Sequence, residues 1–282
     1  MHIQAAAKEI FGVICMSEKA DDNDLNTAVD LVYNSVKNKL QFKGFSTKSL
    51  EFFNEFPVIK SERYDWWNER SDIDYQQFLK PEFNALVKDL TLIISEIDHG
   101  IETNLSKNVG SPIVKDGPRA HRWAAIHTRG RDKRIDVQFF INLTSKGLRV
   151  GIYFGQNKVE PTSWKGFIRY LHSSKEMVFQ QVCNLQKQGY SFINTTHQDY
   201  VNDSLGLVSS PLDSQVMYEH IFRHKEFDIM KLIETSELRS KELVVKILGI
   251  FIETRAMYEL LQLSKFNRRK RTLVNSNFQI SD

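Results

Sequence analysis

The chain has 282 residues, of which 41% are hydrophobic and 26% are charged, and this composition predicts a globular protein with one large or two small domains. The formal net charge of +3 is too small to identify a nucleic-acid-binding protein by bulk charge, so only clustered charges can do so. Cys15 and Cys183 stand alone in apolar surroundings, which argues against a disulfide framework or structural zinc and favours a reducing, cytoplasmic environment. We expect no signal peptide or membrane span, because no window approaches about 18 apolar residues.

Residues 1–40 predict a small N-terminal helical unit. The acidic run Asp21–Asp24 offers N-cap chemistry for a helix over Leu25–Leu40, whose apolar side chains recur on one side. The same run could instead form a metal loop, but no second acidic cluster or glycine-containing calcium loop follows it. We therefore expect a capped, solvated turn at this point.

Two further helical regions are predicted before the centre of the chain. Ser46 is the expected N-cap of the first, which Pro57 ends. The second covers Asp74–Ile97, is interrupted or restarted at Pro81, and carries a buried stripe at helical spacing. The stripe consists of Phe83, Leu86, Val87, Leu90 and Ile94. Asp98–Gly117 is rich in glycine, asparagine, serine and aspartate, and is expected to be a loop.

Three apolar runs in the centre of the chain predict an antiparallel meander. They cover Trp123–Ile126, Ile135–Leu143 and Leu148–Phe154, and short polar turns separate them. The second run alternates loosely, as a strand with one buried face does. The segment Ser145–Gly147 predicts a tight hairpin turn in which glycine supplies a positive φ.

Helices and short strands are expected after the meander. A long helix begins at Thr162 or Ser163 and ends at Gln188, with Gly189 as its C′ residue. Short strands, a short helix, a long helix and a basic tail are then expected, in this order, at Tyr190–Asn194, Gly206–Ser209, Ser214–Phe222, Ser236–Lys265 and residues 267–282. The order of elements predicts an α+β fold, in which helices flank a central antiparallel sheet and residues 41–266 form the main domain.

Cationic side chains are concentrated around the turn between the first two runs of the meander. Six of them fall within sixteen residues: Arg119, Arg122, Arg129, Arg131, Lys133 and Arg134. Arginines in a glycine-containing loop bind phosphate bidentately or reach guanine edges, so these residues are the candidate nucleic-acid-binding set. The alternative is a solvated turn whose charges are partly paired with Asp132 and Asp136.

Three tryptophans are candidates for contact with a nucleic-acid base. Trp66 and Trp67 lie in the aromatic and charged segment Arg63–Arg70 between two predicted helices, and Trp123 opens the first strand of the meander. Their rings could stack on bases or frame a pocket for a flipped base. Tryptophans at such positions more commonly belong to the core, and that interpretation is favoured.

Patterns for catalysis and metal binding are weak. His121, His127 and Asp136 could provide the acid–base group of a hydrolase or nuclease, because the two histidines would share a face of a continuous strand. His220 and His224 have the spacing of zinc ligands on a helix, but residue 221 is isoleucine and no third ligand is evident. The chain has no P-loop and no motif of nucleophilic catalysis. We therefore expect no catalytic residue, metal or cofactor in this chain.

Several segments together suggest a family resemblance. They are Phe45–Phe53, Trp66–Arg70, Lys80–Leu90, the basic meander, Phe227–Lys231 and Met257–Leu261. Over roughly residues 42–265 the chain resembles the N-terminal recognition module of McrB-type restriction subunits and related uncharacterised bacterial proteins. The resemblance implies a target-reading domain of a restriction or phage-defence system, with DNA and a motor or nuclease subunit as partners.

Three hypotheses therefore remain open from the sequence. The first is a DNA-binding recognition module that uses the clustered cations. The second is a protein–protein assembly module without nucleic-acid contact, in which the same cations dock an acidic partner. The third is a hydrolase or nuclease that uses His121, His127 and Asp136.

Overall fold

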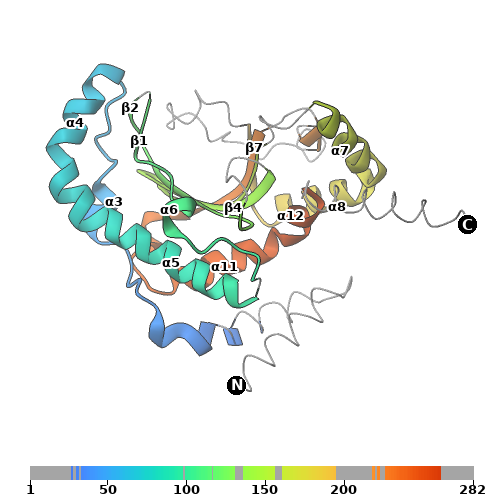
Figure 1. Cartoon of the computed structure of the whole chain (residues 1–282), viewed down its shortest axis with the longest axis horizontal. Helices are drawn as coiled ribbons and strands as arrows, with labels where there is room; N and C mark the ends of the chain where they lie inside the picture. The colour runs from blue at the N-terminus through green and yellow to red at the C-terminus, as the bar shows by residue number, and fades with distance from the viewer. Residues whose placement is uncertain are drawn as a thin grey trace, which may run out of the picture.

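The fold is built around a five-stranded antiparallel sheet with helices packed against one of its faces (Figure 1). The computed structural model describes residues 27, 30, 31, 33–97, 99–115, 117–130, 136–155, 161–194, 218, 219, 221, 222 and 226–261. The strands lie in the order β3-β4-β5-β7-β6, and every neighbouring pair is antiparallel. The predicted α+β class is thereby confirmed.

The strands of this sheet differ greatly in length. Their bounds are β3 Arg122–Ile126, β4 Asp136–Thr144, β5 Gly147–Gly155, β6 Ser191–Asn194 and β7 Glu226–Glu234. A separate two-stranded sheet pairs β1 (Ile113–Val114) with β2 (Gly117–Pro118). Strands β3, β4 and β5 form the predicted meander. Each of their ends lies within one residue of the predicted end.

The β4–β5 hairpin closes as the sequence predicts. Thr144 pairs with Gly147, which leaves a two-residue connection. Gly147 has a φ of 136°, a value that side-chain-bearing residues rarely adopt, and this conformation explains the glycine after the turn. The backbone N–H of Lys146 donates to the Thr144 hydroxyl at 3.2 Å, which satisfies a donor inside the turn.

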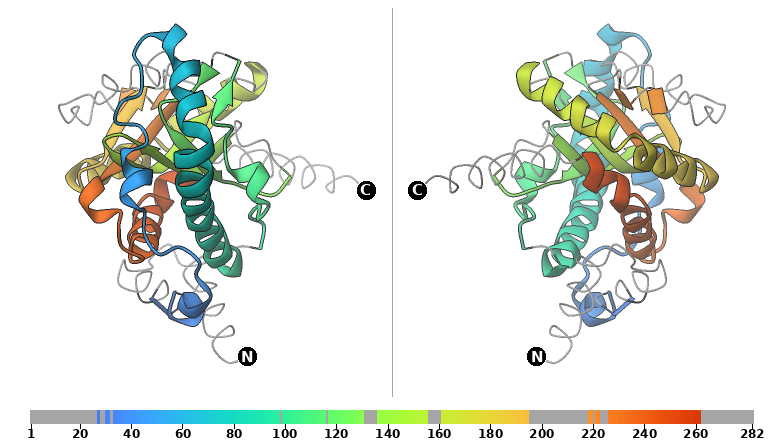
Figure 2. Two further views of the ribbon diagram at one scale, coloured as in Figure 1. Left: turned by 90° about the vertical axis from the view of Figure 1, so that its left-hand side faces the viewer. Right: turned by 90° about the vertical axis from the view of Figure 1, so that its right-hand side faces the viewer.

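Most of the described helices precede the strands in the chain, and the others follow β5 or β7. Their bounds are η1 Lys37–Lys39, α3 Thr47–Glu51, η2 Lys60–Glu62, α4 Arg63–Arg70, η3 Ser71–Leu79, α5 Lys80–Ile97, α6 Leu105–Asn108, α7 Pro161–Ser173, α8 Lys175–Lys187, η4 Thr235–Glu237, α11 Leu243–Glu253 and α12 Arg255–Leu261. Figure 1 shows α5, α11 and α12 beneath the sheet. The side views of Figure 2 show α4 and α5 along one side of the molecule, and α7 and α8 along the other.

The two faces of the sheet have opposite chemistry, because directly paired residues of antiparallel strands project to the same side. One side, here called the core face, carries the fully buried β5 residues Leu148, Val150, Ile152 and Phe154, and it joins the main apolar cluster with the helices. The other side, here called the polar face, carries Gln138, Phe140, Asn142, Arg149, Gly151, Tyr153, Asp228 and Met230. Its apolar members Phe140, Met230 and Tyr153 form a separate small cluster.

A π-helical stretch joins α4 to α5. In η3 the hydrogen bonds close wider turns, and the N–H of Lys80 donates to the Tyr75 carbonyl five residues earlier. Regular α-helix resumes at Lys80, next to Pro81, which has no N–H to donate and whose ring crowds the preceding turn. The wider turn upstream accommodates this proline. The predicted interruption near Pro81 is therefore confirmed, and all five stripe residues lie in α5.

Several predicted helices differ in extent from the structure. Ser46 caps α3 as predicted, since its hydroxyl accepts from the Ser49 N–H at 3.3 Å, but the helix ends at Glu51 rather than near Pro57. The helix predicted to end at Gln188 is two helices that break at Ser174. Gly189 follows α8 with a φ of 84°, as predicted.

The predictions for the C-terminal region and for the loop after α5 were partly wrong. The long helix predicted from Ser236 is two helices that break at Thr254, and the nine-residue strand β7 before it was not predicted. The region Asp98–Gly117, predicted as loop, contains the short helix α6 and strand β1.

Several predicted segments cannot be compared in full. Most of residues 1–32, Gly206–Ser209, most of Ser214–Phe222 and residues 267–282 lie outside the described residues, as do Cys15, His220 and His224.

Candidate functional site

The basic loop, residues 128–134, leaves the sheet at the end of β3. Arg129 is exposed, and its backbone N–H donates to the Gly100 carbonyl at 2.7 Å. Its guanidinium Nη2 also donates to the Ile101 carbonyl at 3.3 Å, and Ile101 forms a β-bridge with Thr128. The start of the loop is therefore fastened to the preceding segment. The other three cations, Arg131, Lys133 and Arg134, lie outside the described residues.

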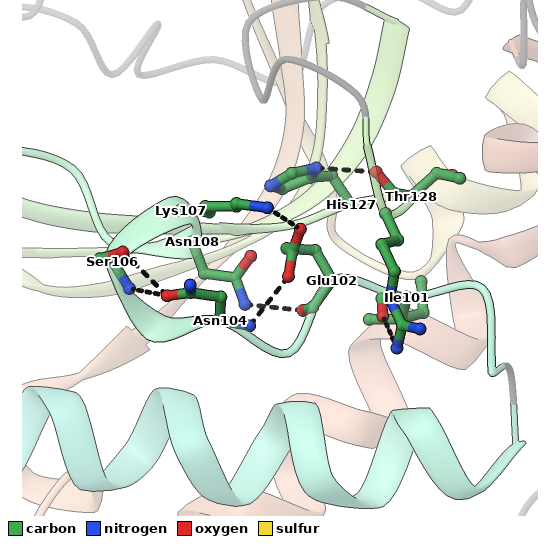
Figure 3. A network of polar contacts seen from close by, with 9 residues as sticks. Ile101, Glu102, Asn104, Ser106, Lys107, Asn108, His127 and Thr128 are labelled. Atoms are coloured by element: carbon green, nitrogen blue, oxygen red, sulfur yellow. Dashed lines mark hydrogen bonds and ion pairs between the residues drawn. The ribbon is translucent and has the colours of Figure 1, made fainter.

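Glu102 is the centre of a polar clamp beside this loop, shown in Figure 3. Its carboxylate accepts from the Asn104 N–H at 3.0 Å and from Lys107 Nζ at 2.9 Å. Its backbone carbonyl accepts from Asn108 Nδ2 at 2.8 Å. Its backbone N–H donates to the His127 carbonyl at 2.9 Å, which ties the clamp to the end of β3. The clamp is defined here as Glu102, Asn104, Lys107, Asn108 and His127.

The clamp keeps Glu102 ionised. The hydrogen bond from the Asn104 N–H lowers the pKa of Glu102 most, followed by the hydrogen bond from Lys107, and the nearby His127 adds to the effect. A carboxyl group held in its charged form is a poor proton donor, so it is unsuited to general acid catalysis. The chemistry of the clamp is therefore that of a fixed anchor for the loop.

Arg122 does not belong to an exposed cationic surface, which corrects the prediction for this residue. It alternates onto the core face, its side chain is buried, and Nη1 donates to the Gly110 carbonyl. Its guanidinium lies 5.6 Å from the centre of the Tyr75 ring and 5.8 Å from that of Phe83, within the range of cation–π contact. Burial lowers the pKa of Arg122. These contacts give it a structural role between β3 and α5.

Arg119 lies at the opposite end of β3 from Arg129. Its side chain is half-buried, and Nη1 lies 3.4 Å from Nε2 of His121. Because about 3.3 Å of strand separates successive residues, the two arginines are roughly 30 Å apart along an extended chain. The structure therefore does not bring Arg119 together with the basic loop.

The tryptophans divide between the core and the sheet edge. Trp66 and Trp67 are buried, and their ring centres lie 5.0 and 6.1 Å from that of Phe52. Trp67 also packs on Tyr75 at 4.8 Å. These two rings are part of the core, as the favoured interpretation held, and offer no exposed surface to a base. Trp123 is half-buried and pairs with Asn142, which places it on the polar face.

The proposed acid–base histidines are separated by a whole strand. His121 precedes β3 and His127 follows it, so about 20 Å of extended chain lies between them. Both are buried, and His127 Nδ1 lies 3.1 Å from the Thr128 carbonyl. The structure thus does not assemble them into one catalytic group. Asp136 begins β4, but its side chain lies outside the described residues.

The polar face was missed by sequence reasoning. Four of its side chains are almost fully buried: Gln138, Asn142, Arg149 and Asp228. The signal available in the sequence was the alternation of polar and apolar residues on β4, together with an arginine inside the apolar strand β5. Alternation of this kind normally indicates a solvated face, and for this reason it attracted no functional interpretation.

Comparisons with models of known protein families and with curated proteins give no match. Within the described part of the chain, no group of three or more histidine, cysteine, aspartate or glutamate side chains could hold a metal ion. None of the described helices is both long enough and apolar enough to cross a membrane.

Proposed function

We propose that this chain is a DNA-binding recognition module that contacts the phosphate backbone through the basic loop. One observation carries the proposal. Arg129 is exposed at the start of a loop whose backbone is fastened at Gly100 and Ile101. The next five residues of the sequence contain three more cations. A tethered start reduces the conformational entropy that such a loop loses on binding.

Lys107 supports the same proposal from the neighbouring segment. Its side chain is 58% exposed, although Nζ binds Glu102, so the clamp presents a partly neutralised cation to solvent close to the basic loop. Phosphate contacts from lysine and arginine supply most of the sequence-independent affinity for DNA. We also propose a role in restriction or phage defence, with a motor or nuclease subunit as partner. This part of the proposal rests on the family resemblance alone.

The test is charge reversal of the loop in the full chain. We expect Arg129→Glu, Arg131→Glu and Arg134→Glu together to weaken binding of duplex DNA at least tenfold. The slope of log affinity against log salt should fall by up to about 2.7, because each lost phosphate contact removes about 0.9. Electrophoretic mobility shifts and fluorescence anisotropy across a salt series measure both quantities.

A matched control removes three cations elsewhere. Lys39, Lys175 and Lys241 are exposed and lie far from the loop in the chain. Changing these three to glutamate alters the net charge equally and should lower DNA affinity only slightly. Equal losses of DNA affinity in both triple variants would refute a local contact between DNA and the basic loop. Absence of DNA binding by the unmodified protein, with retention of an acidic protein on the same loop, would favour the assembly module instead.

A further inference from the structure

The segment before α6 runs alongside the start of the basic loop. Residues 100–102 lie antiparallel to residues 127–129, just beyond the end of β3, and the central residues of the two segments form a β-bridge. The Glu102 N–H donates to the His127 carbonyl at 2.9 Å, and the Arg129 N–H donates to the carbonyl of the glycine at 100 at 2.7 Å. This register pairs Glu102 with His127 and leaves Arg129 opposite a glycine.

The register places a carboxylate and a cation of the basic loop on one surface. Directly paired residues and alternate residues of a strand project to the same side, so the side chains of Glu102, His127 and Arg129 leave the backbone on one side. Diagonal neighbours such as Glu102 and Arg129 have Cα atoms about 7–8 Å apart. The hydrogen bond from Asn104 lowers the pKa of Glu102 most, and the smaller contribution of His127 agrees with this placement.

The two partners of the ion pair between Glu102 and Lys107 differ in exposure. The Glu102 side chain is 5% exposed, and the Asn104 N–H also holds its carboxylate, at 3.0 Å. The Lys107 side chain is 58% exposed, and it reaches Glu102 from α6, as Figure 3 shows. A lysine ammonium has three N–H donors on a flexible stem. Lys107 can therefore turn to an incoming anion while the carboxylate stays in place.

The ion pair lowers the positive charge of this surface in the free protein. Arg129 is exposed, and its guanidinium uses one of five N–H donors for the Ile101 carbonyl, so it retains donors for a phosphate. Glu102 neutralises Lys107 close by. An exposed ion pair changes an equilibrium by at most about fivefold, so a phosphate group is able to compete with Glu102 for this lysine.

We infer that Lys107 is a phosphate-binding residue of the DNA interface and that Glu102 is its built-in competitor. On binding, Lys107 Nζ leaves the Glu102 carboxylate and donates to a backbone phosphate beside the one that Arg129 contacts. The inference rests on the proposed function and adds a residue outside the basic loop to the interface. Phosphate contacts supply the sequence-independent part of DNA affinity, so Glu102 keeps that part low.

The first test is a double-mutant cycle in the full chain, with duplex DNA as the probe. Glu102→Gln keeps an acceptor for the Asn104 N–H and removes the charge, so it should raise DNA affinity about threefold, because no ion pair has to break. Lys107→Ala should weaken binding roughly threefold and lower the salt slope by up to about 0.9.

The coupling between the two positions is the decisive quantity of this cycle. In the Lys107→Ala background, the rise caused by Glu102→Gln should be at least about twofold smaller than in the presence of the lysine. Equal rises in both backgrounds would mean that Glu102 only repels DNA, and would overturn the exchange. A fall in DNA affinity on Glu102→Gln, parallel to a lower melting temperature, would show a purely structural role and would overturn it as well.

The second test follows the Lys107 amine directly. Acetylation of each lysine is timed by mass spectrometry in the free protein and with saturating duplex DNA. We expect DNA to slow acetylation of Lys107 severalfold, and Glu102→Gln to speed it in the free protein. Acetylation of Lys107 at the same rate with and without DNA would overturn the inference.

An ion pair of the same kind on other elements is the matched control. Lys246 of α11 pairs with Glu237, at the end of η4, and each side chain is 46% exposed. Glu237→Gln and Lys246→Ala change the charge in the same way and should alter DNA affinity less than about twofold. Changes as large as those at Glu102 and Lys107 would mean that net charge alone acts, and would overturn the exchange.

The outcomes separate this inference from the proposed function. DNA binding that depends on the cations of the basic loop, but is indifferent to Glu102 and Lys107, would overturn the exchange and leave the proposed function standing. Absence of DNA binding by both the unmodified chain and Glu102→Gln would overturn the two together.

Discussion

The core face and the polar face of the large sheet carry different side chains, although the same strands form both. On the core face, β5 contributes Leu148, Val150, Ile152 and Phe154, which pack under α11 and its neighbours. On the polar face, the same strand contributes Arg149 and Tyr153 between three glycines. The four core-face side chains of β5 are all apolar, whereas the polar face buries Gln138 and Asn142, whose side-chain oxygens accept no hydrogen bond. The comparison teaches that burial alone does not identify a core.

The largest expected effect lies on the core face. The Phe154 ring packs 4.9 Å from Phe227 and 5.7 Å from Phe167, and the side chain is fully buried. Phe154→Ala should lower the free energy of unfolding by about 3–5 kcal/mol, because it removes buried apolar area and leaves a cavity. Urea denaturation followed by circular dichroism measures this change. The control Ile59→Ala, at a side chain that is 57% exposed, should change it by less than about 0.5 kcal/mol. A loss below about 1 kcal/mol for Phe154→Ala would break the contrast between the faces.

The next effect concerns the glycine in the middle of the polar face. A Cβ atom at Gly151 would lie 2.0 Å from the backbone carbonyl oxygen of Ile229 on β7, and backbone cannot move aside cheaply. Gly151→Ala should therefore destabilise the protein by more than about 1 kcal/mol.

Gly249, inside α11, is the matched control, since nothing lies within 4 Å of a Cβ atom placed there. Gly249→Ala should stabilise the protein by about 0.5–1 kcal/mol, because alanine loses less backbone entropy in a helix. Thermal melts of the two variants should shift in opposite directions. A shift in the same direction would contradict the close approach of β5 and β7.

A smaller effect is expected at the clamp beside β3. Glu102→Gln should cost about 1 kcal/mol near neutral pH, because charge-assisted hydrogen bonds to Asn104 and Lys107 weaken. The pKa of Glu102 is lower in the folded protein than its ordinary value of 4.5, so its contribution to stability is present above that value and is lost as the pH falls through the folded pKa. Stability curves of the two proteins should therefore converge in acid. A difference that is constant from neutral to acidic pH would exclude the ionised carboxylate as its cause.

The smallest effect is expected at Lys107. Its side chain is 58% exposed and forms an ion pair with Glu102 at 2.9 Å. Lys107→Ala should cost no more than about 1 kcal/mol, because exposed ion pairs gain little and salt screens them. Added salt should shrink the difference further. A salt-independent loss above that amount would mean that the pair is held more rigidly than an exposed lysine allows.

Local rules predicted the parts of the fold that local chemistry determines. Ser46 caps a helix because its hydroxyl accepts a backbone N–H, and the glycine at 147 follows a hairpin turn because its φ is positive. The strands of the meander were predicted from alternation and apolar runs. In contrast, β7 was missed because its segment becomes a strand by pairing with β5 and β6, which lie far from it in sequence.

The candidate site was harder to predict than the fold. Arg122 was assigned to the nucleic-acid-binding set because it is one of six clustered cations, but its position in β3 places it against the rings of Tyr75 and Phe83. The alternation along Ile135–Leu143 predicted a strand with one buried face, and Gln138 and Asn142 lie on the opposite face. Neither their burial nor their missing hydrogen bonds follows from sequence, because both depend on what surrounds the sheet.

The lengths of the outermost strands affect how the protein behaves at high concentration. The central strands β4, β5 and β7 each have nine residues, whereas β3 has five and β6 has four. The Val109–Gly110 segment also binds along β3, through a bridge to Ala124 and the hydrogen bond from the Gly110 N–H to the Trp123 carbonyl. Short and partly covered edge strands offer little template for pairing with a strand of a neighbouring molecule. This architecture protects its longest strands from aggregation by placing them in the interior of the sheet.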